Sequence, residues 1–591
     1  PLAWSILVFL QPVLASIFTY WYCRTIKLSP LAAAFSAISF SYGSYMTVWL
    51  EYNTIGHVIL WLPLILLSIE KRWAAITILS LSLPFFAGHP QIAIFIYIFS
   101  LAYFWIRNHR LRIALLLPLG IAGVQLIPGI ELILNSARGP LLYDFFIDKV
   151  LIQPWQLITL VLPDFFGNPA TRTYWPADTY IGKVLSIGIV PLFFLLAAIR
   201  AKNPVKNIFT ATCIIILIFA TKNPITLLVY RLHHLRTNSP TLMIFLFQFG
   251  FSILCGIGFD LFAREKHTLK KLARRAAAVL LLLCIGFFLV WFNKYPQGYR
   301  ALVYATLLSG MTLVMFFIAI WKKHVMTVAL TVVLLIHMAD LFYAFHKFNP
   351  FVPATLVYPP TDVTNYLAEK GGVDRIWGFG TAAIEANFAT QLGLYSPDGY
   401  DPLYPAWYGA FFLQPGGKAS RSDAQIAPGF GSRDLIDNAG RIVLLNRLGV
   451  KYILDRVENQ TIVPESLTKI YDGDGWIVYE NTDAVARARL ESETGIVRID
   501  SYEPNRIDLT VSTNVLDTLV LSDTYYPGWI ASIDGKKTGV RRTSHAMRAV
   551  SIPAGNHTVT FSYEPLSVRL GLAITVISLV VLAVLWKYEK H

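Results

Sequence analysis

Thirteen strongly apolar stretches divide this 591-residue chain, and lysine and arginine collect at every second gap between them. The positive-inside rule assigns such basic gaps to the cytoplasmic face of a membrane. The alternation therefore predicts a multi-pass protein in which every loop has a defined side. The basic gaps are residues 24–27, 71–72, 107–112, 200–206, 264–275, 322–323 and the tail from Lys587.

The composition and the charge agree with a membrane protein. The chain is 55% hydrophobic and 15% charged, whereas a soluble domain is about 25% charged. The net charge is +14, and the basic gaps hold 20 Lys or Arg against four acids at or beside them, which leaves −2 for the remainder. Because the basic excess marks topology, we do not expect a nucleic-acid partner.

The fold class expected is a polytopic α-helical membrane protein with about 13 transmembrane helices, since a helix needs about 20 residues to cross the hydrocarbon core. The third and fourth spans are short, and we expect them to be tilted, kinked or partly re-entrant. The spans are 2–22, 31–49, 55–70, 73–88, 91–107, 111–134, 183–200, 206–221, 241–262, 276–292, 301–321, 325–345 and 567–586.

The domain organisation follows from two long outer segments. Residues 1–346 form the transmembrane bundle with an outer loop at 135–182, and residues 567–591 form the final helix and a cytoplasmic tail. Between them lies an extracytoplasmic domain, with a mixed α/β region at 347–490 and a β-sandwich-like region at 491–566, where residues alternate with period two. The outer loop is an interfacial helix with an aromatic belt, a lid over a lipid-linked substrate, or both together.

Polar residues in the outer turns are candidates for contact with a phosphate or an acceptor. Glu51 and His57 lie at the turn before the third span, and His89 and Gln91 interrupt the fourth and fifth spans. The alternative for each histidine is a structural hydrogen bond.

Ionisable residues near the outer helix ends form a second set. Glu131 and Asp340 lie inside the outer quarter of their spans, where an ionisable group is costly and is a functional candidate by default. Arg138 and Arg236 lie on outer loops, where a guanidinium could grip a phosphate with two hydrogen bonds. The alternatives are pairing with backbone or a buried arginine for the acids, and solvation for the arginines.

No strong metal or nucleotide motif is present in the sequence. Asp472-Gly473-Asp474 could be read as a metal-binding acid pair, but Asp-Gly between strand-like runs favours a turn. No metal site is therefore assigned, and a divalent cation is left open as a cofactor.

A succession of short motifs resembles the bacterial YfhO membrane-protein family. They are Thr19-Tyr20 with Arg24 and Leu28-Ser29, Trp61-Leu62-Pro63, Ala87-Gly88-His89-Pro90-Gln91, Leu162-Pro163-Asp164-Phe165-Phe166-Gly167, Ala339-Asp340-Leu341 with Asn349-Pro350, Tyr358-Pro359-Pro360, Tyr525-Tyr526-Pro527-Gly528-Trp529, and Pro553-Ala554-Gly555-Asn556-His557. Each motif is weak alone, but their order extends over nearly the whole chain.

The resemblance implies a function. The family is similar to GT-C glycosyltransferases, multi-pass enzymes that take sugar from a polyprenyl-phosphate carrier at the outer face of the bacterial cytoplasmic membrane and decorate envelope polymers such as lipoteichoic acid. Such enzymes carry their key acid in the first outer loop. This chain begins at what resembles the second helix. We therefore expect the first helix and the first outer loop, with the main catalytic base, to be missing here.

Two functional hypotheses follow. The first is a glycosyltransferase that uses a polyprenyl-phosphate sugar, with membrane lipid and an envelope polymer as partners. Asp164, Glu131 and Glu51 are then the candidate catalytic acids, and His57, His89, Gln91, Arg138, Arg236 and Asp340 the candidate substrate-binding residues. The second hypothesis is a transporter or flippase of lipid-linked envelope precursors, with the outer domain as a docking module.

Overall fold

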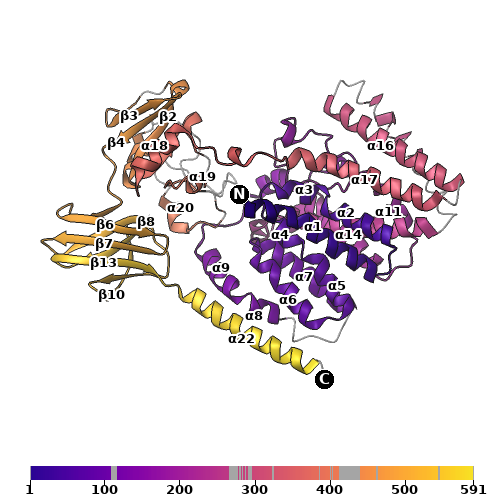
Figure 1. Cartoon of the computed structure of the whole chain (residues 1–591), viewed down its shortest axis with the longest axis horizontal. Coiled ribbons are helices and arrows are strands. Elements are labelled where there is room, and N and C mark those ends of the chain that lie inside the picture. Colours follow the sequence, from indigo (N-terminus) through magenta and orange to yellow (C-terminus); the bar gives the residue numbers. More distant parts are fainter. Residues whose placement is uncertain are drawn as a thin grey trace. The chain divides into compact units, whose positions relative to one another are not determined.

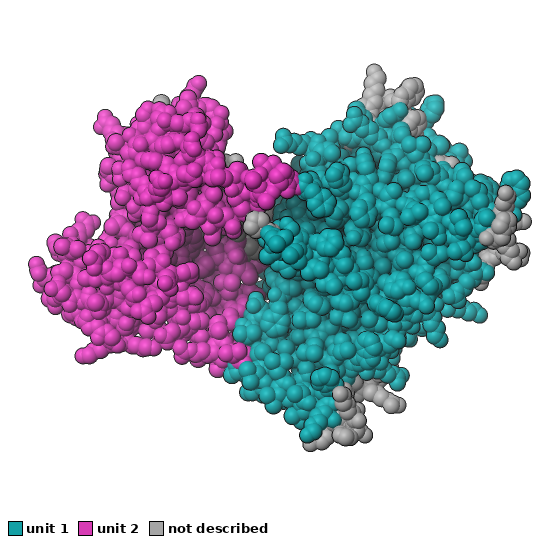
Figure 2. All heavy atoms as spheres, in the orientation of Figure 1, with its two compact units in different colours: residues 1–126, 140–351, 573–591 teal, residues 127–139, 352–572 magenta. Residues whose placement is uncertain are grey.

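The computed structural model describes residues 2–589 apart from 108–115, 265–276, 322–324, 385–386, 412–438, 461–462, 544–545, positions 400 and 402, and several positions within 279–295. About half of the predicted span 276–292 therefore lies outside the described residues. The chain forms two compact units, coloured separately in Figure 2. Unit 1 comprises residues 1–126, 140–351 and 573–591, and unit 2 comprises 127–139 and 352–572.

Unit 1 is a helical membrane bundle. Within the described residues, six helices are long and apolar enough to cross a membrane, and the predicted count of 13 stays a prediction. The six are α1 (Leu2–Thr25), α7 (Pro90–Arg107), α14 (Ile244–Arg264) with the turn before it, α16 (Pro296–Trp321), α17 (Met326–Phe348) and α22 (Leu566–Glu589).

Helix α14 lies at the centre of this bundle (Figure 1), and nearly all of its residues are therefore buried. It packs on α2 (Pro30–Ser41), α11 (Leu192–Ala198) and α12 (Lys206–Ala220). Small residues permit the close approach that stabilises helix pairs in lipid. A Cβ at Gly258 would lie 2.0 Å from the Phe194 carbonyl oxygen, so α11 and α14 could not pack this closely with a larger residue there.

The shorter helices show that several predicted spans are interrupted. The span 31–49 is α2 followed by α3 (Ser44–Leu50), and 55–70 is α4 (Gly56–Ile59) followed by α5 (Leu62–Lys71). The span 111–134 contains α8 (Leu117–Ile121) and α9 (Gly123–Asn135). The remaining helices of unit 1 are α6 (Ala74–Phe86), α10 (Tyr143–Phe145) and α13 (Pro224–Val229).

The prediction of one helix over 183–200 is wrong for its first half. Residues 183–190 are non-helical and all buried, and the helix α11 begins only at Leu192. Gly188 has a φ of +89°, which a right-handed helix does not allow. Pro191 lacks an amide hydrogen, so it is tolerated at a helix start but not inside one. The apolar composition predicted burial correctly but not conformation.

Unit 2 begins with a mixed region. It has the helices α18 (Asp362–Gly371), α19 (Phe388–Gln391), α20 (Ala406–Phe411) and α21 (Ala439–Arg447). Its sheet has the order β1-β2-β4-β3, from β1 (Arg375–Gly378), β2 (Val450–Arg456), β3 (Leu467–Gly473) and β4 (Trp476–Asn481). Asp474 and Gly475 both have positive φ between β3 and β4. The predicted turn between the two strand-like runs is thus confirmed at Asp474-Gly475, while Asp472 and Gly473 belong to β3.

The second region of unit 2 consists of two antiparallel sheets. Their orders are β10-β9-β13-β7-β6 and β11-β12-β8-β5. The strands are β5 (Ala488–Leu490), β6 (Ile496–Glu503), β7 (Arg506–Thr513), β8 (Asp517–Thr524), β9 (Trp529–Ile533), β10 (Lys536–Gly539), β11 (Arg541–Thr543), β12 (Met547–Ile552) and β13 (Gly555–Tyr563). One apolar cluster contains residues of both sheets, including Leu509, Leu521 and Phe561. The alternating pattern therefore predicted these paired sheets from their inward side chains.

Candidate functional site

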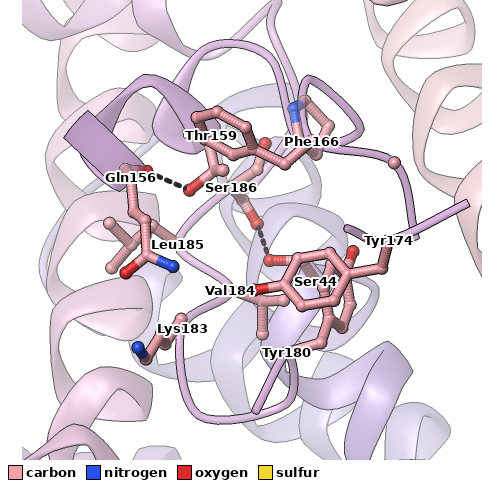
Figure 3. A pocket seen from close by; sticks show the side chains of 12 residues that line it. Ser44, Gln156, Thr159, Phe166, Tyr174, Tyr180, Lys183, Val184, Leu185 and Ser186 are labelled. Carbon is pink, nitrogen blue, oxygen red and sulfur yellow. Dashed lines mark hydrogen bonds between the residues drawn. The ribbon is translucent and has the colours of Figure 1, made fainter. Parts of the chain in front are cut away.

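A small hollow lies in unit 1, between the predicted outer loop and the 183–190 segment (Figure 3). Part of its lining is apolar or aromatic, including Pro163, Phe166 and Leu185, and part is polar, including Gln156, Thr159 and Lys183. The lining residues are Ser44, Gln156, Thr159, Pro163, Phe166, Gly167, Tyr174, Tyr180, Lys183, Val184, Leu185 and Ser186.

The 183–190 segment forms one wall of this hollow, and distant side chains hold it in place. The Ser186 carbonyl accepts hydrogen bonds from the Ser44 amide at 2.9 Å, the Ser44 hydroxyl at 2.7 Å and the Gln248 amide nitrogen at 3.0 Å. Gln248 also donates to the Val184 carbonyl at 3.3 Å. Non-helical backbone at membrane depth needs such internal partners because lipid offers none.

Asp340 supports the same segment from α17. Its Oδ2 accepts a hydrogen bond from the Ile189 amide at 3.0 Å. Beside it, the Nε2 atom of buried His337 lies 2.8 Å from the Ser39 hydroxyl. Of the alternatives open for Asp340, the contact seen is the one with backbone, and its role in binding substrate stays a prediction.

Asp178, which is not itself a lining residue, is the shared hydrogen-bond partner of three polar lining residues, Gln156, Tyr174 and Lys183. Its carboxylate accepts hydrogen bonds from the Lys183 ammonium at 2.5 Å, the Gln156 amide at 2.9 Å and the Tyr174 hydroxyl at 2.6 Å. Burial and the contact with Asp178 raise the pKa of Tyr174, so this hydroxyl remains a donor. The sequence motifs gave no signal for Asp178 or Lys183, because neither belongs to a recognisable pattern.

Asp164 lies in the turn that adjoins the hollow. The amide of Gly167 donates to the Asp164 carbonyl at 2.9 Å, and Pro163 and Phe166 on either side line the hollow. The Asp164 carboxylate pairs with the Lys347 ammonium at 2.9 Å, and its side chain is 35% exposed. An accessible carboxylate beside a cation is thus present at the edge of the lining.

Three other predicted residues of unit 1, His57, Gln91 and Arg236, have structural contacts, and a fourth, Glu51, is exposed. His57 Nε2 lies 3.2 Å from the Gln11 amide nitrogen, and the Gln91 amide donates to the Ser239 carbonyl at 2.9 Å. The Arg236 guanidinium is buried and donates to backbone carbonyls, including that of Leu141 at 2.8 Å. Glu51 is exposed, although partial desolvation raises the pKa of its carboxyl.

The other predicted residues are placed as follows. His89 precedes α7, in the turn between α6 and α7 of unit 1. Glu131 and Arg138 belong to unit 2, so the structure does not bring them into the hollow described above. The backbone amide of Arg138 donates a hydrogen bond to the Ser136 hydroxyl at 3.3 Å. All of these assignments to catalysis or binding stay predictions.

The sequence assigns no metal site to this chain and leaves a divalent cation open as a cofactor. No group of three His, Cys, Asp or Glu side chains among the described residues is arranged to hold a metal ion. The use of a divalent cation as a cofactor therefore stays untested by these side chains.

Comparison with known families bears on the second half of unit 2. Residues 474–575 match the model of the family described as bacterial membrane protein YfhO. This segment is YfhO-like. The YfhO match contains the Tyr525 to Trp529 and Pro553 to His557 motifs, both antiparallel sheets and the start of α22. The resemblance expected from the motifs is confirmed there.

Solved structures give more distant similarities. Two crystal structures of ArnT from Cupriavidus metallidurans, one in the apo state and one bound to undecaprenyl phosphate, align with 81% of this chain and with 83% and 84% of their own chains, at 14% identity and a TM-score of 0.39. The arabinofuranosyltransferase AftD from Mycobacteria aligns with 95% of this chain and 51% of its own, at 10% identity and a TM-score of 0.42. No curated protein matches.

Proposed function

We propose that this chain is a membrane glycosyltransferase that moves a sugar from a polyprenyl-phosphate carrier to a cell-envelope polymer or lipid at the outer face of the bacterial cytoplasmic membrane. The observation that carries the proposal is the hollow in unit 1, where apolar lining, the Lys183–Asp178 pair and the Asp164–Lys347 turn adjoin one another. A polyprenyl phosphate has the matching chemistry, with an apolar chain and an anionic head. The family resemblance supports the same class.

The chemistry needs a base and a cation. The acceptor oxygen forms a bond to the sugar carbon as the bond from that carbon to the carrier phosphate breaks. Asp164 would take the proton of the acceptor hydroxyl, because it is the accessible carboxylate at the hollow. Lys347 and Lys183 would stabilise the charge on the departing phosphate. Glu51 and Glu131 stay candidate auxiliary acids, and His57, His89, Gln91, Arg138 and Arg236 candidate phosphate or acceptor contacts.

A transfer assay with purified chain in proteoliposomes tests the proposal. The probes are a radiolabelled polyprenyl-phosphate hexose and isolated envelope polymer. We expect Asp164→Asn to reduce the rate by about 100-fold or more, which is the usual contribution of a positioned base. Asp148→Asn is the matched control, because Asp148 is in the same loop and forms an exposed pair with Lys222. Equal rates for Asp164→Asn and wild type would remove Asp164 from the mechanism.

A transporter or flippase of lipid-linked precursors is the second candidate. It is favoured by the buried non-helical segment 183–190, since discontinuous helices are characteristic of transport sites. Movement of a fluorescent polyprenyl-phosphate sugar across the vesicle bilayer, without transfer to any acceptor, would select this alternative. Transfer without movement would exclude it and support the glycosyltransferase.

A further inference from the structure

A continuous group of half-buried aromatic rings lies in unit 2, and we call it the aromatic platform. Its members are Trp407, Tyr526, Trp529 and Tyr563, all partly exposed. The ring centroids are 6.3 Å apart for Trp407 and Tyr526, 6.5 Å for Tyr526 and Tyr563, and 5.4 Å for Trp529 and Tyr563. Trp407 comes from α20, while the other three rings come from the ends of β9 and β13 and the turn before β9.

Two guanidinium groups lie on the ends of this platform. The Arg548 Cζ is 3.6 Å from the centroid of the Trp529 ring, and the Arg542 Cζ is 5.2 Å from that of Trp407. Aromatic faces attract cations in this arrangement. Arg542 is exposed, so its guanidinium remains available to a ligand in solution.

The buried charges beneath the platform are unbalanced. Arg375, Arg487 and Arg548 surround Asp523, and all four are at least nine-tenths buried. Asp523 Oδ1 accepts from Arg375 at 3.1 Å and from Arg487 at 2.9 Å. Although burial favours the neutral acid, the three arginines hold the pKa of Asp523 below its usual value. Within this four-residue group the charge is therefore +2, and an uncompensated buried charge is costly.

Arg548 is the member of this cluster with unused hydrogen-bonding capacity. Its Nε donates to the Thr524 carbonyl at 3.0 Å, whereas its buried Nη1 has no hydrogen-bond partner among the described residues. Burial lowers the pKa of Arg548 to about 10, which still leaves the group charged at neutral pH. A buried donor without a partner costs free energy, and an anionic group that reached Arg548 would remove that cost.

A carboxylate and an amide complete the polar surroundings. The Tyr526 hydroxyl hydrogen-bonds to the side chains of Glu131 and Asn135, which belong to the same unit. Flat rings can pack against the C–H faces of a sugar, while carboxylate and amide groups bind its hydroxyls. The excess of guanidinium groups favours a sugar that also carries a negative charge.

From this juxtaposition we infer that the aromatic platform of unit 2 binds an anionic carbohydrate, and that it is the acceptor subsite of the enzyme. The inference rests on the proposed function, because it names the class of acceptor. Unit 2 would then select anionic over neutral sugars, because a neutral sugar would pack on the rings but leave the guanidinium groups without an anionic partner. Because Glu131 hydrogen-bonds to Tyr526, its carboxylate would then contact the bound acceptor.

Saturation-transfer difference NMR on the full chain in detergent micelles tests the inference. The probes are glucose 6-phosphate and glucose. We expect saturation of the ring C–H protons of glucose 6-phosphate, with glucose binding about tenfold more weakly, which corresponds to one lost charge-assisted hydrogen bond. Equal binding of glucose and glucose 6-phosphate would overturn the anionic preference, and binding of neither sugar would overturn the site.

Variants separate the platform from general effects. Arg542→Gln should weaken glucose 6-phosphate about tenfold, and Trp529→Ala should abolish saturation of the ring protons. Arg506→Gln is the matched control, because Arg506 is an exposed arginine paired with Asp508 on β7. Because Trp529 also packs in β9, the exposed Arg542 variant keeps the test valid if Trp529→Ala fails to fold. An unchanged affinity in Arg542→Gln would contradict the inference.

Two further outcomes distinguish this inference from the proposed function. Binding of glucose 6-phosphate by a chain that transfers no sugar would refute the glycosyltransferase and the acceptor role while supporting an anionic carbohydrate site. Sugar transfer by a chain that binds no glucose 6-phosphate would refute the platform alone. Competition by anionic lipid vesicles, with no effect of any sugar phosphate, would show that the platform contacts membrane headgroups and would overturn the carbohydrate assignment.

Discussion

Gly188 is the residue on which the wall of the hollow depends most directly. Its φ of +89° disfavours any residue with a Cβ, and an added Cβ would lie 2.7 Å from Asp340 Oδ2 and 3.1 Å from the His337 ring. We expect Gly188→Ala to destabilise unit 1 by about 2 kcal/mol or more. Gly310→Ala should not destabilise α16, because Gly310 is helical and nothing lies within 4 Å of its added Cβ. Thermal unfolding in detergent measures both, and equal melting temperatures would contradict the expectation.

His557 and Asp534 make a pH-dependent contact in the YfhO-like sheets. His557 Nδ1 lies 2.7 Å from Asp534 Oδ2. The hydrogen bond raises the pKa of His557 above 6.5, so its stabilising effect is present below 6.5 and is lost as the pH rises through the folded-state value. The same bond lowers the pKa of Asp534 below 3.8, so that contribution is lost as the pH falls through the lowered value.

The stabilisation from this pair should therefore be greatest between about pH 4 and 6.5. We expect His557→Gln to lower the melting temperature in that window and to have little effect near pH 9, where histidine is neutral. Melting curves of wild type and variant across pH measure the difference. A difference that is constant from pH 5 to pH 9 would show that the two residues are not linked through protonation.

At the scale of elements, the 183–190 segment depends on Gln248 of α14. Replacing Gln248 with Leu removes the donor to the Val184 carbonyl, one of the three donors to the Ser186 carbonyl, and the acceptor for the Tyr45 amide at 3.2 Å. Each buried group left without a partner costs about 1–3 kcal/mol, so we expect a large loss of thermal stability and of sugar transfer. Gln125→Leu, at an exposed position of α9, is the matched control. Retention of both properties by Gln248→Leu would show that the segment is held by other contacts.

The same segment shows what the sequence could and could not predict. Hydropathy correctly indicated that residues 183–190 are buried, and the period-two pattern correctly indicated strands such as β7 and β13. Both signals are local. The conformation of 183–190 depends on Ser44, Gln248 and Asp340, which are far away in the sequence, and no local pattern contains that information.

The candidate site was predictable only to a similar extent. Asp164 was identifiable because it lies in a recognisable motif, and the structure places that motif beside the hollow. Asp178 and Lys183 were missed because their importance comes from burial and mutual contact, with exposed side-chain fractions of 6% and 3%. Buried ion pairs between loop residues are visible only after folding brings them together.

At the scale of the whole molecule, the charge pattern predicts which side of the membrane each part occupies. The basic gaps carry 20 Lys or Arg against four acids, and such excess charge is retained in the cytoplasm. Residue 71 should therefore be cytoplasmic and residue 536 extracytoplasmic. Both lysines are exposed, so Lys71→Cys and Lys536→Cys are suitable probes in a background that lacks the four native cysteines. In intact cells, a membrane-impermeant maleimide should label only the variant Lys536→Cys, and permeabilisation should make the variant Lys71→Cys reactive. Labelling of Lys71→Cys alone in intact cells would invert the topology, place the aromatic platform in the cytoplasm and contradict transfer at the outer face.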